Sequence, residues 1–488
     1  MLFNSLQFVV FFIVITSLYF ILSHKYRWLL LLFASCFFYM FFKPIYILIL
    51  GFTIVIDYFA GILIENENMP DKKTKYLIVS IIANVGVLAV FKYYNFINSN
   101  IDGLGILLGF KNPIPYLQIL LPIGLSFHTF QAMSYTIEVY WGRQKAERHF
   151  GIYALYVMFY PQLVAGPIER PQNMIHQFHE EKFFNYSNAV TGLRLMMWGM
   201  FKKVVIADRL VLFTDPVFNA PHNYSASTIF IASIFFSFQI FCDFSGYSDI
   251  ALGTARVMGF KLMTNFNMPY HSRSISEFWK RWHISLSTWF RDYLYFSLGG
   301  NRVSVKRTYF NLFFVFLVSG FWHGANWTFI VWGALHGFYL IFGLLTSKYR
   351  NKVIEILNIH KIKWLNNTLN VVVTFTLVTY AWIFFRANNI HDTLLISRKL
   401  LSIPSEFLQV IRSRKLFFLN LPNLIILREC FMCILFLEIA HLVSIKFDFK
   451  NNFNKIHWVL RWSMYYGGVL AIYYLGVFEK HQFIYFQF

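Results

Sequence analysis

The feature that most constrains this chain is a series of long stretches without charged side chains. Residues 6–22 contain no Asp, Glu, Lys or Arg, and comparable stretches recur along the sequence. A helix needs about 20 apolar residues to cross the hydrocarbon core of a bilayer. Hydrophobic residues make up 57% of the chain and charged residues only 14%, a balance far from that of soluble domains. The sequence therefore predicts an all-α, polytopic integral membrane protein.

The apolar stretches predict about 11 to 13 transmembrane or re-entrant helices. They lie near 5–23, 28–43, 45–64, 76–98, 117–140, 150–166, 188–213, 225–258, 308–322, 326–346, 368–386, 424–445 and 457–477. Two of them, 28–43 and 308–322, are short enough to be re-entrant or tilted. No internal repeat and no long soluble segment divides the pattern, so we expect a single membrane domain over residues 1–488.

The positive charge of the chain follows the expected spans. The formal net charge is +20, and basic residues cluster at 24–27, 71–75 and 143–145, after the first, third and fifth spans. Loops rich in Lys and Arg stay in the cytoplasm, so we expect the N-terminus and the loop at 99–116 to face outward. Membrane topology accounts for these charges, and no nucleic-acid partner is expected.

The four cysteines form no recognisable functional motif. Cys430 and Cys433 are spaced as CxxC, but they lie in an apolar stretch without partner ligands. A disulfide framework or a zinc site needs further ligands at fixed spacing. We therefore expect no metal site and no redox role.

The central segment, residues 241–337, is where chemistry concentrates. It is more polar than the rest of the chain yet rich in Trp, Gly and Phe, which is typical of polar groups packed within protein. It contains the stretches DFSGYSD (243–249), FWKRWHISLS (278–287), WFRDY (289–293) and SGFWHGANW (319–327). Ionisable groups at membrane depth are costly and usually face an internal cavity, so this segment holds the candidate site residues.

His323 is the first candidate, because it lies between an expected span and the apolar run 327–340. Gly320 and Gly324 flank it and permit close backbone approach beside the imidazole. A neutral imidazole there could accept a hydroxyl proton. From the residues alone, this interpretation and that of a buried histidine bonded between helices are equally supported.

His283 is the second candidate. Phe278, Trp282 and Leu286 share one helical face, and His283 falls off it, so spacing alone favours an interfacial helix. Basic residues nearby, among them Arg281, could attract the phosphates of a nucleotide-containing donor. The positive-inside rule explains the same residues equally well.

Acidic residues in apolar surroundings leave other interpretations open. Asp243 and Asp249 are six residues apart, about 600° around a helix, so they are not an obvious pair of acid and base. Asp57, Glu138 and His128 lie at apparent membrane depth and would line the pathway of a transporter or channel. That alternative predicts flux without any thioester, but the inverted repeats and paired broken helices typical of transporters are not evident.

Four segments, in this order, resemble motifs of the membrane-bound O-acyltransferase family, in particular its bacterial alginate O-acetyltransferase branch. They are PQLVAGPIER (161–170), DFSGYSD (243–249), RWHISLS (281–287) and FWHG (321–324). The resemblance implies helices around a central tunnel. It maps the essential histidine of the family onto His323 and a second motif histidine onto His283, on separate helices that meet at the tunnel. Supporting positions are then Asp249, Arg281, Asp292, Trp322 and Asn326.

The resemblance also implies a reaction. An acyl group, expected to be acetyl from acetyl-CoA, would pass from a cytoplasmic thioester across the bacterial inner membrane to hydroxyls of an exported polysaccharide, through a periplasmic partner. The thioester is a substrate, and no bound cofactor is expected. His323 would act as general base, and His283 would orient the donor or stabilise the oxyanion. The enzymatic alternative is D-alanyl transfer to a wall polymer from a carrier-protein thioester.

The last residues of the chain, FIYFQF (483–488), are similar to aromatic C-terminal motifs of the same branch. One hypothesis is that Tyr485 enters the tunnel and relays the acyl group. An aromatic anchor at the membrane interface explains the same residues and is the favoured interpretation.

Overall fold

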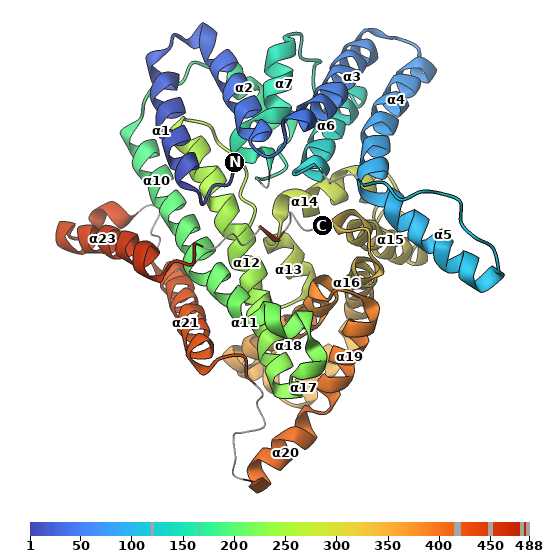
Figure 1. Cartoon of the computed structure of the whole chain (residues 1–488), viewed down its shortest axis with the longest axis vertical. Coiled ribbons are helices and arrows are strands. Elements are labelled where there is room, and N and C mark those ends of the chain that lie inside the picture. The colour runs from blue at the N-terminus through green and yellow to red at the C-terminus, as the bar shows by residue number, and fades with distance from the viewer. Residues whose placement is uncertain (119–121, 165, 414–420, 448–451, 479–482, 485–488) are drawn as a thin grey trace. The chain divides into compact units, whose positions relative to one another are not determined.

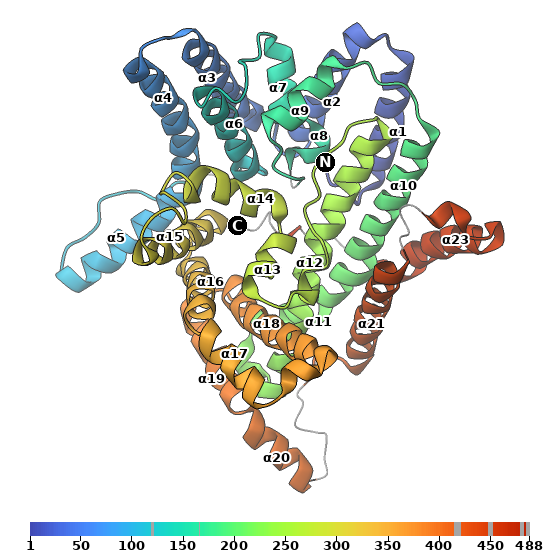
Figure 2. The same cartoon turned by 180° about the vertical axis from the view of Figure 1, so that it is seen from behind.

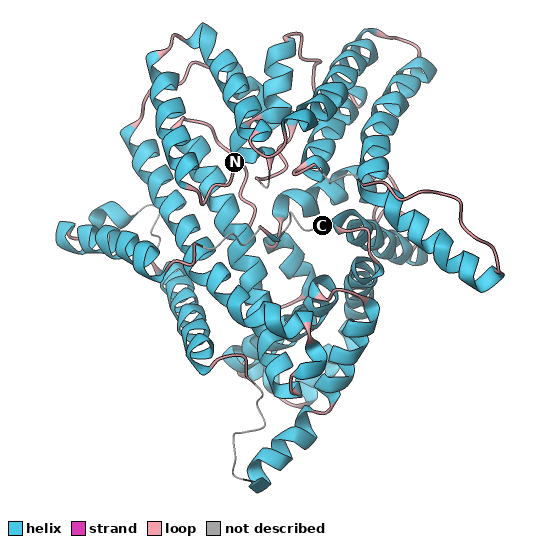
Figure 3. Ribbon diagram, viewed as in Figure 1, coloured by secondary structure: helices cyan, strands magenta, loops and turns pink. Residues whose placement is uncertain are grey.

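The computed structural model describes residues 1–488 except 119–121, 165, 414–420, 448–451, 479–482 and 485–488. The described residues form helices joined by loops, and no strand occurs among them (Figure 3). The predicted all-α class is therefore confirmed. The chain forms two compact units, the first comprising Met1–Met196 with Tyr247–Thr264 and the second Met197–Gly246 with Asn265–Phe488.

The first unit contains the N-terminal helices. They are α1 (Leu6–Ile21), α2 (His24–Met40), α3 (Ile47–Asn66), α4 (Pro70–Leu88), α5 (Tyr94–Leu108), α6 (Leu125–Tyr140), α7 (Phe150–Met158), α8 (Tyr160–Leu163) and α9 (Pro171–His179). Two helices, α10 (Tyr186–Met200) and α12 (Ala226–Val257), are divided between the units.

The second unit contains the remaining helices. They are α11 (Asp208–Asn219), α13 (Ile275–Arg281), α14 (Ile284–Trp289), α15 (Val305–His323), α16 (Trp327–Leu345), α17 (Ser347–Ile356), α18 (Lys363–Arg386), α19 (Ile390–Leu401), α20 (Ile403–Ser413), α21 (Leu424–Lys446) and α23 (Trp458–Leu475). Short turns complete it, including the 3₁₀ turn η5 (Pro269–His271) and the π-helical turns η3 (Phe201–Ala207) and η6 (Phe290–Tyr295).

Five helical segments of the described chain are long and apolar enough to cross a membrane. They are Pro44–Asn66, Pro70–Leu108, Ala226–Val257, Trp327–Leu345 and Lys363–Arg386. Each overlaps one of the expected spans. Ala226–Val257 is largely buried within the protein, whereas the other four segments expose many large hydrophobic side chains, as helices in lipid do.

One expected span, 150–166, is broken in two. The helix α7 ends at Met158, and the single turn α8 follows with Pro161 in its first positions. Proline has no backbone N–H, so a continuous helix would lose the hydrogen bond from residue 161 to the carbonyl four residues earlier. The apolar pattern alone did not show this break.

Helices α15 and α16 lie side by side in the second unit (Figures 1 and 2). Their contact depends on glycine, because a Cβ atom at Gly320 would collide with the Phe329 carbonyl and one at Gly333 with the Phe316 carbonyl. Small residues let two helix backbones approach closely. This close packing fixes the end of α15, where His323 lies.

Candidate active site

His323 is the last residue of α15, and its side chain points into an aromatic core. The residue is 4% exposed. Its ring centroid lies 4.9 Å from Trp322, 4.9 Å from Trp332 and 5.3 Å from Phe385, with edge-to-face geometry in each pair. Aromatic rings favour this arrangement. The imidazole is therefore held in one orientation by three rings from α15, α16 and α18.

His283 lies between α13 and α14 in a left-handed backbone conformation, with φ 42° and ψ 55°. Residues other than glycine adopt this conformation at a cost of about 1–2 kcal/mol, and such strain is concentrated at functional sites. The segment around Asn265 offsets that cost, because the Asn265 carbonyl accepts a hydrogen bond from the Ile284 N–H at 2.9 Å. The strained backbone at His283 and the segment that contains Asn265 together position a fully buried imidazole.

The side chain of Asn265 sets the tautomer of His283. Its Oδ1 accepts hydrogen bonds from the Ser285 backbone N–H at 3.2 Å and from the Ser285 hydroxyl at 2.9 Å. The backbone donor identifies this atom as the amide oxygen, and it lies 3.1 Å from His283 Nδ1. Nδ1 must then carry the hydrogen, which leaves the lone pair on Nε2.

Burial keeps His283 neutral. This residue lies in the connecting segment between α12 and α15, outside the five membrane-capable segments. Loss of hydration lowers the pKa of His283 to about 3, because burial disfavours the charged imidazolium. At neutral pH the side chain is therefore uncharged, and one of its ring nitrogens can accept a hydrogen bond.

Three tryptophans link the two histidines within the second unit. Trp282, next to His283, has its ring 4.9 Å from that of Trp382. Trp382 lies 5.8 Å from Trp332, which in turn packs against His323. The two histidines are 40 residues apart in sequence, and the tertiary structure places both around one aromatic core.

A third buried histidine, His336, belongs to the same core, although no motif considered above contains it. Its ring lies 4.9 Å from that of Trp332, and its Nδ1 accepts a hydrogen bond from Trp279 Nε1 at 3.3 Å. Because an indole N–H can only donate, the ring hydrogen of His336 sits on Nε2. The rule that flagged His323, an ionisable residue inside an apolar run, would also have found His336.

The supporting candidates have separate surroundings. Arg281 forms an ion pair with Glu277 at 2.7 Å, and Asp292 forms one with Arg291 at 2.8 Å. Asn326 caps α16, since its Oδ1 accepts a hydrogen bond from the Thr328 N–H at 3.0 Å. Of the other two, Trp322 packs on His323, and Asp249 lies on the part of α12 that belongs to the first unit.

Asp243, the first acid of the DFSGYSD stretch, is part of a buried ionic group. Lys203 Nζ lies 2.7 Å from both Asp243 and Asp208. The second oxygen of Asp243 accepts a hydrogen bond from the Ile484 N–H at 2.8 Å. Asp243 thus forms an ion pair with Lys203 and accepts a hydrogen bond from a backbone N–H near the C-terminus.

The C-terminal segment reaches the surroundings of His283. Phe483 and Ile484 are 1% and 4% exposed. The ring of Phe244 lies 5.7 Å from Phe483 and 4.6 Å from His283, so one ring contacts both. Tyr485, the hypothetical acyl relay, lies outside the described residues.

The residues of the transport alternative lie in the first unit, where Asp57 has a complete set of local partners. Its carboxylate accepts hydrogen bonds from Ser80 at 2.6 Å and Asn84 at 2.8 Å. His128 and Glu138 are buried on α6. In the second unit, the thiols of Cys430 and Cys433 lie 3.7 Å and 3.6 Å from the backbone carbonyls of Arg209 and Val205.

The chain is similar to known proteins across the region that contains this core. Residues 148–387 match the model of the membrane-bound O-acyltransferase family. The chain is 40% identical over 396 residues to the probable alginate O-acetylase AlgI of Pseudomonas aeruginosa, covering 80% of this chain and 73% of the relative. It is 35% identical over 500 residues to the peptidoglycan O-acetyltransferase of Helicobacter pylori, covering 94% and 91%. It is 30% identical over 291 residues to the teichoic acid D-alanyltransferase of Streptococcus thermophilus, covering 54% of this chain and 68% of the relative.

Proposed function

Because this chain belongs to the membrane-bound O-acyltransferase family, we propose that it moves acetyl from a cytoplasmic thioester, acetyl-CoA, to hydroxyls of a polysaccharide outside the membrane. The chain is a multi-pass membrane enzyme, an O-acyltransferase. Acetyl as the acyl group and a polysaccharide as the acceptor are supported by the names of the two relatives that cover most of the chain, an alginate O-acetylase and a peptidoglycan O-acetyltransferase.

The observation that carries the catalytic proposal is the pair of buried histidines around one tryptophan core. His323 acts as general base: it takes the proton of the attacking hydroxyl as the oxygen bonds to the thioester carbonyl. The carbon–sulfur bond then breaks, and His323 returns the proton to the leaving thiolate. The ring orientation imposed by Trp332 and Phe385 supports this role, because proton transfer requires a fixed geometry.

His283 orients a substrate in this scheme. Its neutral ring commits the Nδ1 hydrogen to Asn265, so Nε2 can accept a hydrogen bond but cannot donate one. This geometry favours orientation of a donor or hydroxyl group over the alternative of oxyanion stabilisation, which needs a hydrogen-bond donor.

The acceptor is reached through a periplasmic partner. The sequence between the expected spans contains no long soluble domain that could hold a polymer, so we assign that task to a second protein. The enzyme lies in the bacterial inner membrane with its N-terminus outside and basic loops toward the cytoplasmic donor. The acyl group passes through the central tunnel that the family resemblance implies.

D-alanyl transfer from a carrier-protein thioester is the second candidate, because the chain is also similar to a teichoic acid D-alanyltransferase. That similarity covers 54% of the chain, whereas similarity to the peptidoglycan O-acetyltransferase covers 94%. The acetyl proposal therefore ranks first.

Release of free thiol from acetyl-CoA tests the proposal. Purified protein in detergent is assayed with and without a periplasmic extract, and wild type is compared with His323→Ala and with His391→Ala, whose side chain is 89% exposed. Release by wild type and by His391→Ala, but not by His323→Ala, supports the proposal. If equally folded wild type and His323→Ala are both inert, acetyl-CoA is not the donor and the carrier-protein thioester takes its place.

A further inference from the structure

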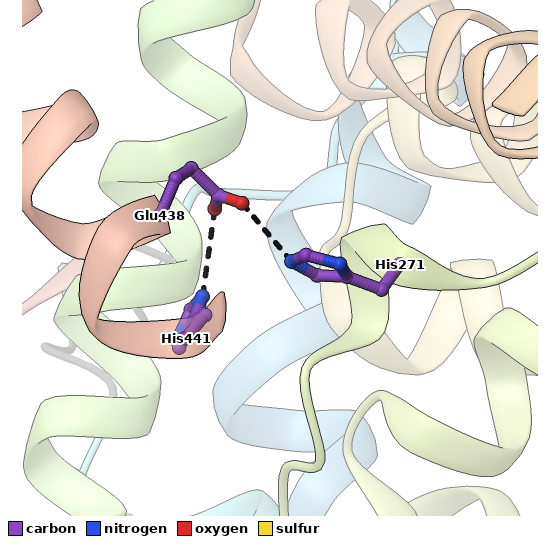
Figure 4. A group of neighbouring side chains, drawn as sticks. All are labelled: His271, Glu438 and His441. Carbon is purple, nitrogen blue, oxygen red and sulfur yellow. Dashed lines mark hydrogen bonds and ion pairs between the residues drawn. The ribbon is translucent and has the colours of Figure 1, made fainter. Parts of the chain in front are cut away.

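His271, Glu438 and His441 come together in the second unit, although they are far apart in sequence. Figure 4 shows one carboxylate oxygen of Glu438 directed toward each imidazole. His271 Nε2 lies 3.0 Å from Glu438 Oε2, and His441 Nδ1 lies 3.4 Å from Glu438 Oε1. The three potential ligand atoms lie within 4.8 Å of one another. Within the described residues this is the one such group of three or more His, Cys, Asp or Glu side chains.

Local structure explains how the three side chains converge. Glu438 and His441 are three residues apart on α21, so they occupy the same helical face. The spacing Glu-x-x-His also occurs on helices that ligate metals in carboxylate-bridged metalloproteins. His271 ends the turn η5, and its N–H bonds to the carbonyl of Met268 at 3.2 Å. Met268 has a φ of 42°, a sharp reversal of the chain before that turn.

The three side chains are close enough for one metal ion to reach an atom of each. Tetrahedral zinc binds nitrogen and oxygen ligands at about 2.0–2.2 Å, which places neighbouring ligand atoms roughly 3.3–3.5 Å apart. The distances from the Glu438 carboxylate to the two histidines, 3.0 Å from Oε2 to His271 and 3.4 Å from Oε1 to His441, are near this value, and each involves a different oxygen. The two imidazole rings are 5.9 Å apart and nearly perpendicular, so both nitrogens can face one point beside the carboxylate.

We propose that His271, Glu438 and His441 form a binding site for a divalent transition metal of the zinc type. Two imidazoles and one carboxylate are a ligand set that zinc accepts, and three protein ligands leave a fourth position for water. The side chains of His271, Glu438 and His441 are 26%, 31% and 12% exposed, so the group is sheltered but open to a water ligand. The imidazoles bind through deprotonated nitrogens. The site is additional to the acyltransferase chemistry.

The proposed metal site connects α21 to residues that pack against Trp282. The ring of Phe241 lies 5.8 Å from that of His441 and 6.3 Å from that of Trp282, which precedes His283. Its other anchor, His271, leads directly into α13. A bound metal therefore connects α21 to the segment that contains His283. It also stabilises the folded state, because a ligand that binds only the folded state raises the free energy of unfolding.

Metal binding by the full chain tests the proposal. Tag-free protein in detergent is stripped with EDTA, dialysed and titrated with Zn²⁺, with Co²⁺ as a spectroscopic probe of coordination. We expect about one metal ion per chain and a Co²⁺ spectrum with nitrogen and oxygen ligands. His271→Ala and Glu438→Gln should each weaken binding by at least about tenfold, whereas His391→Ala should bind as wild type does.

Thermal unfolding gives a second readout that does not depend on activity. Added Zn²⁺ should raise the midpoint of wild type and His391→Ala but leave His271→Ala and Glu438→Gln unchanged. Wild type that binds no metal at micromolar concentration would overturn the proposal, whether or not the variants fold. Metal binding by both His271→Ala and Glu438→Gln with the affinity of wild type would also overturn it. The three side chains would then be a hydrogen-bonded link between α21 and η5.

Discussion

Asp57 in the first unit and three histidines in the second unit are buried in different surroundings. In the first unit, Asp57 lies among hydroxyl and amide groups, and Ser80 and Asn84 donate to its two oxygens. In the second unit, His283, His323 and His336 pack against aromatic rings, and His283 uses one ring nitrogen for Asn265. A carboxylate with its hydrogen bonds satisfied is a structural element. A neutral imidazole with an oriented lone pair can exchange protons, so burial identifies a reactive group only together with its surroundings.

The largest expected effect is on His323. Replacement by Ala should lower acyl transfer by about 10²–10⁴-fold, the usual contribution of a general base. Thiol release from acetyl-CoA measures it, with the thermal midpoint as the control for folding. Activity within twofold of wild type would show that His323 takes no part in the chemistry. The buried histidines of the second unit would then be structural, as Asp57 is in the first.

Asn265 should have the next largest effect, as a positioning residue for His283. Asn265→Ala removes the acceptor for the Nδ1 hydrogen and should lower activity by about 10–100-fold, as other losses of an orienting partner do. Asn265→Asp restores an acceptor and adds a negative charge, which raises the pKa of His283. Its activity should recover in part and be lost, as pH falls, at a higher pH than in wild type. A uniform loss with no change in the pH profile would assign Asn265 a structural role only.

Stability should depend on pH through His283. The pKa of its ring is about 3 in the folded protein and about 6.5 when unfolded, so the unfolded state binds the proton first. Stability is complete above pH 6.5 and falls as pH drops toward 3, by at most about 1.4 kcal/mol per pH unit. The thermal midpoint between pH 7 and pH 5 should therefore fall further for wild type than for His283→Asn. Equal slopes would show that His283 is hydrated in the folded state.

The smallest expected effect lies in the first unit. The Ser80 hydroxyl donates to Asp57 at 2.6 Å and lies 2.9 Å from the Thr136 hydroxyl. Ser80→Ala should cost about 1 kcal/mol of stability, the usual contribution of one hydrogen bond. Activity per folded molecule should stay within twofold of wild type. A loss comparable to that of His323→Ala would favour the transport pathway, in which Asp57 participates.

Much of the fold was predictable because the signal is local. Apolar stretches near 45–64, 225–258 and 326–346 predict membrane helices, and the structure has apolar helical segments at Pro44–Asn66, Ala226–Val257 and Trp327–Leu345. Helix ends were less predictable. The break between α7 and α8 depends on Pro161 inside an apolar run, and hydropathy does not register the loss of one hydrogen bond.

The candidate site was predictable in its members but not in its geometry. His323 stands out because titratable groups are rare in apolar sequence, and both His323 and His283 stand out because their motifs resemble a known family. No sequence pattern indicated that Asn265 sets the tautomer of His283, or that His336 joins the same core. Those relations depend on contacts between residues 18 and 57 positions apart.

The sequence by itself determined that this protein is helical, that it lies in a membrane and that it has the motifs of an acyltransferase. These properties follow from composition and from short local patterns, which the chain has before it folds. Only the tertiary structure decided which side chains share a core, which nitrogen of His283 has the lone pair and that His271 meets Glu438 and His441. Such relations arise when distant segments pack together, because the hydrogen bonds and ring contacts that define them form between helices and not along the chain.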